Sequence, residues 1–84
     1  MTLKILYFAG LREAVGTGAE SLALPAGVST AAGLRDYLAQ LDSAHGALLT
    51  TKNLRVAVNQ KMVGMDAPIV DGNEVAFFPP VTGG

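Results

Sequence analysis

The chain has 84 residues, of which half are hydrophobic and 15% are charged, and its formal net charge is −1. This length suits one domain, and so high a hydrophobic content excludes a disordered chain. The few basic residues form no stripe that would attract nucleic acid. Cysteine is absent, which excludes disulfides, thiol nucleophiles and thiolate metal sites, and the single histidine, His45, cannot build a metal cluster.

The first half of the chain predicts two strands. Residues 3–8 are rich in β-formers and almost uniformly apolar, as in a central strand. Residues 9–16 follow as a short helical turn or loop. Residues 20–24 suit a strand that puts Leu22 and Leu24 on one face, and they end at Pro25, a turn residue. Because the chain begins with a strand pattern and not with a signal peptide, we expect a cytoplasmic protein.

One amphipathic helix is predicted next. Ser29 or Thr30 supplies the N-cap, and the helix is expected to end by about Gly46. Its apolar positions recur at helical spacing and are Ala31, Leu34, Leu38 and Leu41, with Tyr37 beside them. His45 then lies at the helix end, where we expect an exposed loop histidine.

The second half predicts further strands and turns. Residues 54–59 alternate, residues 62–63 suit a short edge strand, and residues 74–78 form the last strand before Pro79-Pro80 ends it. The order of elements predicts an α+β fold in which one main helix packs on one face of a mixed sheet. We expect this domain to span residues 1–80 and a flexible tail to span residues 81–84.

Internal residues offer no catalytic pattern. The carboxylates of Asp66, Asp71 and Glu74 surround predicted turns, and turn chemistry explains them. We therefore expect no catalysis by this chain alone, and no metal or cofactor bound by it.

The C-terminal segment carries the one feature that suggests chemistry. Pro79-Pro80 favours an extended backbone, so the residues after it should project from the domain. Gly83 and Gly84 have no side chains, so they can thread a narrow channel and leave the terminal carboxylate unshielded. Adenylation would make that carboxylate an electrophile, and sulfide could then replace AMP. A frayed terminus without function is the alternative, and at this level both remain open.

Three segments resemble the small subunits of molybdopterin synthase, also named molybdopterin-converting factor small subunits, which belong to the ubiquitin-like β-grasp sulfur-carrier superfamily. The segments are Tyr7-Phe8-Ala9-Gly10-Leu11-Arg12-Glu13, Val56-Ala57-Val58-Asn59-Gln60 and the closing run from Asp71 to Gly84. Within the closing run, Asn73 stands where the family usually has aspartate. The resemblance covers nearly the whole chain, and its closing run is the most specific part.

The resemblance implies a β-grasp fold with the first and last strands parallel and adjacent. It also implies that an E1-like enzyme uses ATP to adenylate Gly84, and that sulfur transfer then leaves a thiocarboxylate there. The tail residues Pro80, Val81, Thr82 and Gly83 would thread into the large synthase subunit. There the thiocarboxylate would donate sulfur to cyclic pyranopterin monophosphate, within an assembly of two small and two large subunits.

The resemblance further implies a partner interface formed by Phe8, Arg12 and Phe78 beside the tail. Three other functions remain open. The chain could carry sulfur for thiamine, cysteine or tRNA thiolation, it could be a protein modifier joined to lysine, or it could be an interaction domain whose tail has no role. Each of the first two would use the same activated glycine.

Overall fold

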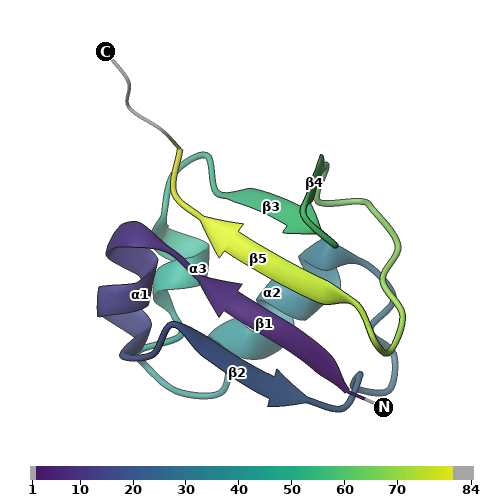
Figure 1. Ribbon diagram of the computed structural model, residues 1–84. Coiled ribbons are helices and arrows are strands. Elements are labelled where there is room, and N and C mark those ends of the chain that lie inside the picture. The colour runs from purple at the N-terminus through teal and green to yellow at the C-terminus, as the bar shows by residue number, and fades with distance from the viewer. Residues whose placement is uncertain (1, 81–84) are drawn as a thin grey trace.

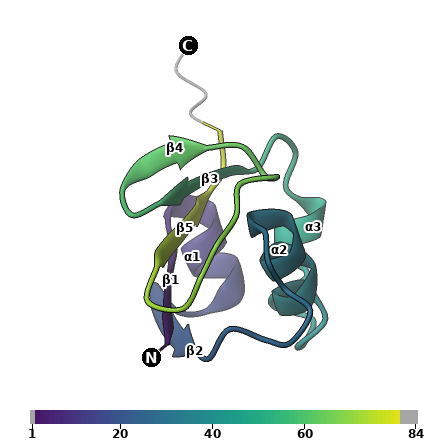
Figure 2. The same cartoon turned by 90° about the vertical axis from the view of Figure 1, so that its right-hand side faces the viewer.

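The computed structural model describes residues 2–80, in which five strands form one sheet and three helices pack against it (Figures 1 and 2). In chain order the elements are β1 (Leu3–Tyr7), α1 (Ala9–Val15), β2 (Ala19–Leu22), α2 (Ala31–Ala39), α3 (Ala47–Thr50), β3 (Arg55–Val58), β4 (Lys61–Val63) and β5 (Glu74–Phe78). The expected tail, residues 81–84, lies outside the described residues, so the boundary between domain and tail stays a prediction.

The sheet has the strand order β2-β1-β5-β3-β4. Its central pair, β1 and β5, runs parallel, with Ile5 beside Val75 and Tyr7 beside Phe77. The other three pairs are antiparallel. This is the β-grasp arrangement, so the predicted fold class and the predicted pairing of the first and last strands are confirmed.

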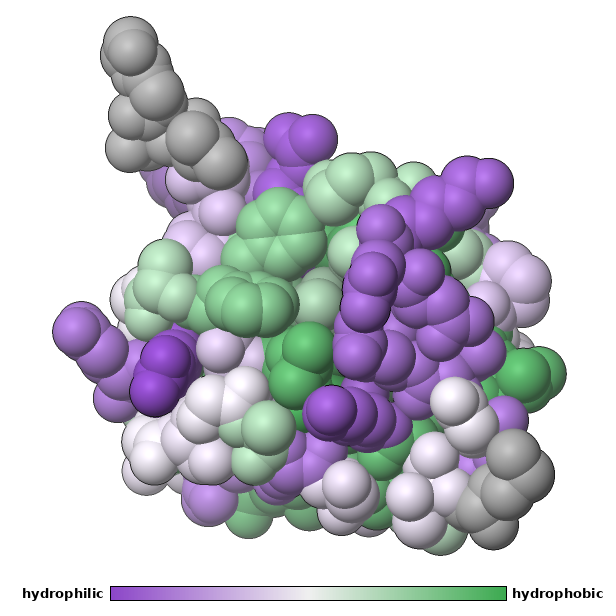
Figure 3. All heavy atoms as spheres, viewed as in Figure 1, coloured by the Kyte–Doolittle hydropathy of each residue, from purple (hydrophilic) through white to green (hydrophobic). Residues whose placement is uncertain are grey.

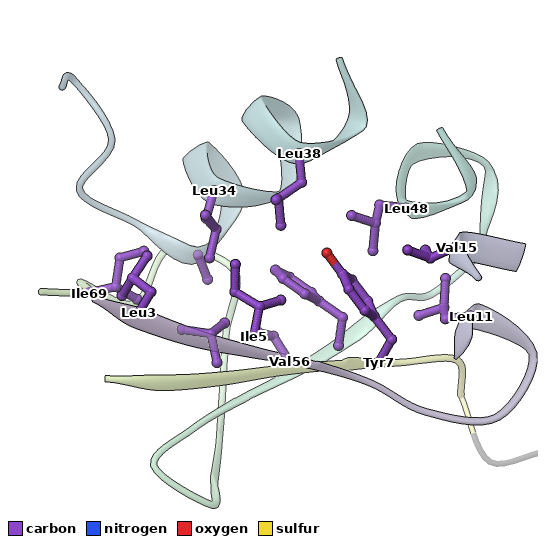
Figure 4. Packing of buried hydrophobic residues seen from close by; sticks show 13 residues of the cluster. Leu3, Ile5, Tyr7, Leu11, Val15, Leu34, Leu38, Leu48, Val56 and Ile69 are labelled. Atoms are coloured by element: carbon purple, nitrogen blue, oxygen red, sulfur yellow. The ribbon is translucent and has the colours of Figure 1, made fainter. Parts of the chain in front are cut away.

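The core lies between the sheet and the helices (Figure 4). Leu3, Ile5 and Tyr7 alternate along β1 and are almost fully buried against the helix layer. Side chains at alternating strand positions point to opposite faces, so Leu6 on β1 and Ala76 on β5 belong to the other face. All three described helices contribute buried residues to the same core, which leaves the other face of the sheet without a helix.

The prediction of one helix that ends by about Gly46 is wrong in its second half. Helix α2 ends at Ala39, and Leu41, expected on its buried face, is 48% exposed. Beyond the helix, the Asp42 carboxylate accepts a hydrogen bond from the backbone N–H of His45 (2.9 Å). Such a side-chain contact gives the backbone an alternative to helical hydrogen bonding and favours a turn. The separate short helix α3 then begins at Ala47, which the sequence pattern did not predict.

The segment after β1, predicted as a helical turn or loop, is the helix α1. It ends at Gly16, whose φ of 93° is left-handed and whose N–H donates to the Arg12 carbonyl (3.0 Å). Glycine adopts this conformation without a Cβ clash, so Gly16 ends the helix as a C-cap residue. None of the helices in residues 2–80 has the length and apolar character that a bilayer-spanning segment needs.

Candidate functional site

The face of the sheet opposite the helices carries an apolar hollow of about 920 Å³, which we call the open-face groove. It is lined by Leu6, Phe8, Ala9, Ala57, Gln60, Glu74, Ala76, Phe78, Pro79 and Pro80. Figure 3 views this face and shows hydrophobic residues gathered over the middle of the sheet, bordered by hydrophilic ones. Because apolar surface in contact with water is unfavourable, a continuous patch of this kind is typical of a protein-binding surface.

Phe8 and Phe78 form the aromatic end of the open-face groove. Phe8 follows β1 directly and Phe78 ends β5, so the parallel pairing of these strands brings both rings to one edge of the sheet. Their centroids lie 6.5 Å apart and the ring planes meet at 77°, an edge-to-face contact. Phe8 remains 48% exposed, so its ring is available to a partner.

Arg12 lies next to the open-face groove but does not line it. It projects from α1 over a second, more polar hollow that is also lined by Thr17 and Gly18. Ala9 borders both hollows, so Arg12 is a neighbour of the aromatic end. The structure thus brings the three predicted interface residues Phe8, Arg12 and Phe78 to one region, and their role in binding stays a prediction.

Pro79 and Pro80 continue β5 along the edge of the groove. Neither has a backbone N–H to donate, which stops the sheet pairing at Phe78. The next residues in the chain are Val81, Thr82, Gly83 and Gly84, which lie outside the described residues. The groove therefore borders the last described residues before the predicted reactive end.

His45 is not the exposed loop histidine that was expected, because it is only 8% exposed. Its ring Nδ1 lies 2.8 Å from Asp42 Oδ1, and its Nε2 lies 2.7 Å from Glu20 Oε2. The same Glu20 oxygen accepts a hydrogen bond of 2.7 Å from the Tyr7 hydroxyl. We call these four residues, Tyr7, Glu20, Asp42 and His45, the histidine cluster.

In the histidine cluster, hydrogen bonds between His45 and its carboxylate partners favour the charged form of the imidazole and of Asp42. Burial alone would lower the pKa of His45, but hydrogen bonds to Asp42 and Glu20 outweigh it and raise that pKa. Both ring nitrogens can donate only when the imidazole is protonated. The hydrogen bond from His45 in turn lowers the pKa of Asp42, while burial and the neighbouring Glu20 raise the pKa of the Tyr7 hydroxyl.

The histidine cluster lies on the helix side of the sheet, away from the open-face groove. It joins β1, β2 and the loop after α2, so its role is to hold the helix layer to the sheet. Sequence reasoning missed it because Glu20 and His45 are 25 positions apart and no local spacing connects them. Within residues 2–80, no group of three or more His, Cys, Asp or Glu side chains, the histidine cluster included, has an arrangement that could hold a metal ion.

Comparison with known proteins identifies a family, related sequences and similar structures. A model of the ThiS family matches residues 5–84. The molybdopterin synthase sulfur carrier subunit of Escherichia coli (strain K12) is 46% identical over 82 residues, covering 98% of this chain and 99% of that protein. The structure of the small archaeal modifier protein 1 of H. volcanii superposes with a TM-score of 0.75 at 25% identity, covering 95% of this chain and 98% of that one.

A fourth likeness concerns the fold alone. The complex of subunits 1 and 2 of the molybdopterin-converting factor from Helicobacter pylori 26695 contains a chain that matches with a TM-score of 0.67 at 20% identity. The match covers 100% of both chains. At this identity the match shows a shared fold and nothing more.

Proposed function

We propose that this chain, which belongs to the ThiS family, is the sulfur carrier subunit of a molybdopterin synthase. The observation that carries the proposal is the position of the open-face groove. Its aromatic end, formed by Phe8 and Phe78, borders Pro79 and Pro80, after which only four residues remain before the terminal carboxylate. A partner seated on this groove would also hold the C-terminus.

The proposed chemistry takes place at Gly84. An E1-like enzyme would use ATP, the carboxylate would attack the α-phosphate, and pyrophosphate would leave to give an acyl adenylate. Sulfide, HS⁻, would then add to the carbonyl and expel AMP, so that a C–S bond replaces the C–O bond to phosphate. The product is a thiocarboxylate on Gly84, and the activating enzyme supplies the nucleotide site.

The second step would take place in the large synthase subunit. We infer that its active site receives Val81, Thr82, Gly83 and Gly84 and passes the sulfur to cyclic pyranopterin monophosphate. Two such donations would build the dithiolene. In this proposal the large subunit supplies the catalytic side chains, and the domain of this chain supplies the recognition surface, including Phe8, Arg12 and Phe78. Aromatic and arginine side chains are the residue types most often found at the centres of interfaces.

Intact-mass spectrometry tests the proposal. The chain is incubated with the E1-like enzyme, ATP and a sulfur source, and we expect a mass gain equal to the difference between sulfur and oxygen. The matched control lacks Gly83 and Gly84 and should show no gain, while its circular dichroism spectrum stays that of the full chain. No gain in the full chain, with the same enzymes active on another carrier, would refute the proposal.

The choice of pathway needs its own experiment, because carriers for thiamine, cysteine or tRNA thiolation would show the same mass gain. Expression of this chain in a strain that lacks its own molybdopterin synthase carrier should restore molybdoenzyme activity. The matched control is a strain lacking a thiamine carrier, whose growth without thiamine should not be restored. The opposite pattern would assign the chain to thiamine synthesis.

A second candidate function is protein modification. Its support is the likeness to a small archaeal modifier protein. A modifier would use the same activated Gly84 but would end in an amide bond to a lysine of another protein. Immunoblots of cells that produce a tagged chain distinguish the two, since a modifier gives a ladder of larger conjugates and a sulfur carrier does not.

A further inference from the structure

Among residues 2–80, four residues other than glycine have a left-handed backbone: Ala9, Asn53, Asn59 and Gln60, with φ between 52° and 69°. Asparagine tolerates this conformation because its short side chain can hydrogen-bond locally. Alanine and glutamine have no such compensation. Both Ala9 and Gln60 line the open-face groove, so the strained backbone coincides with the proposed docking surface.

Gln60 occupies a position where glycine is the usual residue. Val58 of β3 pairs with Lys61 of β4, so Asn59 and Gln60 form a two-residue hairpin loop in which both φ angles are positive, 52° and 69°. These angles define a type I′ turn, whose common sequence is Asn-Gly. The turn therefore holds a long side chain at a position where the fold itself would favour none.

The two residues of the turn differ in what they do for the fold. Asn59 donates its N–H to the Glu74 carbonyl (2.8 Å), and its side-chain oxygen accepts from the Glu74 N–H (2.9 Å). The Gln60 side chain, by contrast, is exposed and its amide makes no hydrogen bond within residues 2–80. Asn59 thus has a structural role, and Gln60 has none that the described residues show.

Gln60 lies at one end of the groove. This end is near Glu74, where β5 begins, and Phe78 and Pro80 lie at the other end, where β5 leaves the sheet. At about 3.3 Å per strand residue, these two ends are about 13 Å apart. A partner that contacts both ends is held in one register along β5, and this register decides how far residues 81–84 reach into it.

We propose that Gln60 is a specificity-determining contact for the large synthase subunit. Its amide, which offers two donors and one acceptor, would pair with a peptide group or a side-chain amide of that subunit. A partner that covers the groove removes water from this amide, so an unpaired amide would weaken binding. The inference rests on the proposed function and adds a residue that sets where the partner sits.

Three variants test the inference: Gln60→Gly, Gln60→Ala and the control Asn53→Gly. Asn53 is also left-handed and exposed but does not line the groove. Calorimetric titration with the large subunit should give about five- to thirtyfold weaker binding for both Gln60 variants, as expected for one lost polar contact. Asn53→Gly should bind like the wild type, and thermal unfolding should show Gln60→Gly at least as stable as the wild type.

The possible results distinguish failure of this inference from failure of the proposed function. If the wild type binds the large subunit and accepts sulfur while Gln60→Gly binds equally well, the inference fails and the proposed function stands. If Gln60→Ala binds like the wild type and only Gln60→Gly is weak, backbone rigidity and not the amide is responsible, and the inference is overturned. If the wild type does not bind the large subunit, the proposed function and the inference fail together.

Discussion

Replacing His45 with glutamine would remove the positive charge from the histidine cluster and keep a side chain of similar size that can make a neutral hydrogen bond. In the wild type, the contact between His45 Nε2 and Glu20 Oε2 is 2.7 Å long, and the two side chains are 10% and 28% exposed. A hydrogen bond to a charged group at such a site contributes about 1.5–3 kcal/mol, against about 0.5–1.5 kcal/mol for a neutral one.

We therefore expect His45→Gln to lower the free energy of unfolding by about 2 kcal/mol at pH 5.5, including the loss of the second ring contact. The contact with Asp42 adds little to this figure because that carboxylate is 56% exposed and solvent screens it. For a chain of 84 residues, total stability is about 4–13 kcal/mol. A change of 2 kcal/mol corresponds to a fall in Tm of about 10 °C.

The loss should depend on pH in one direction. The pKa of His45 is raised in the folded state above its ordinary value of 6.5. Its charge therefore stabilises the fold in full below pH 6.5, and this stabilisation disappears as the pH rises through the raised pKa. Asp42, whose pKa is lowered from 3.8, contributes above that pH and loses its contribution as the pH falls. The difference between wild type and variant should thus shrink from pH 5.5 to pH 9.

Urea unfolding followed by circular dichroism at pH 5.5, 7 and 9 measures this difference. The control variant is Asp36→Asn, which removes an exposed charge next to Arg35 and should change stability little at any of these pH values. A difference for His45→Gln that is the same at all three pH values would show that folding leaves the pKa of His45 unchanged, and this result would refute the reasoning. A difference that grows with pH would show that folding lowers the pKa of His45, which is opposite to the expected direction.

Three further variants test the core, a helix cap and the groove. Phe77→Ala removes a fully buried ring and should lower stability by about 3–5 kcal/mol, seen as a large fall in Tm by calorimetry. Thr30→Ala removes the hydroxyl that accepts from the Gly33 N–H (3.1 Å) and should cost about 1 kcal/mol in urea unfolding, which Thr30→Ser should largely restore. Phe8→Ser should leave Tm nearly unchanged, because the ring is half exposed, and should weaken binding to the large subunit at least tenfold in titration calorimetry. Equal binding by Phe8→Ser would remove the open-face groove from the proposed interface.

Local sequence patterns predicted the strands well because a strand is recognised from the residue types and the period of its own few residues. The pattern of residues 74–78 predicted the last strand, and β5 spans Glu74–Phe78, with Val75 and Phe77 fully buried. The helix was predicted too long because the apolar spacing continues to Leu41, while the turn begun by Asp42 depends on a contact that periodicity does not describe.

The sequence by itself determined the order of the strands along the chain and the reason for looking at Gly84, since a chain that has no cysteine and carries Gly83-Gly84 has few other groups to offer for chemistry. Only the tertiary structure decided the rest. The pairing of β1 with β5 brings Phe8 and Phe78 together across 70 positions of sequence, and the packing of helix layer on sheet buries His45 between two carboxylates. Such contacts depend on which distant segments meet in the fold, and hydrophobic periodicity reports only which face of each segment is buried.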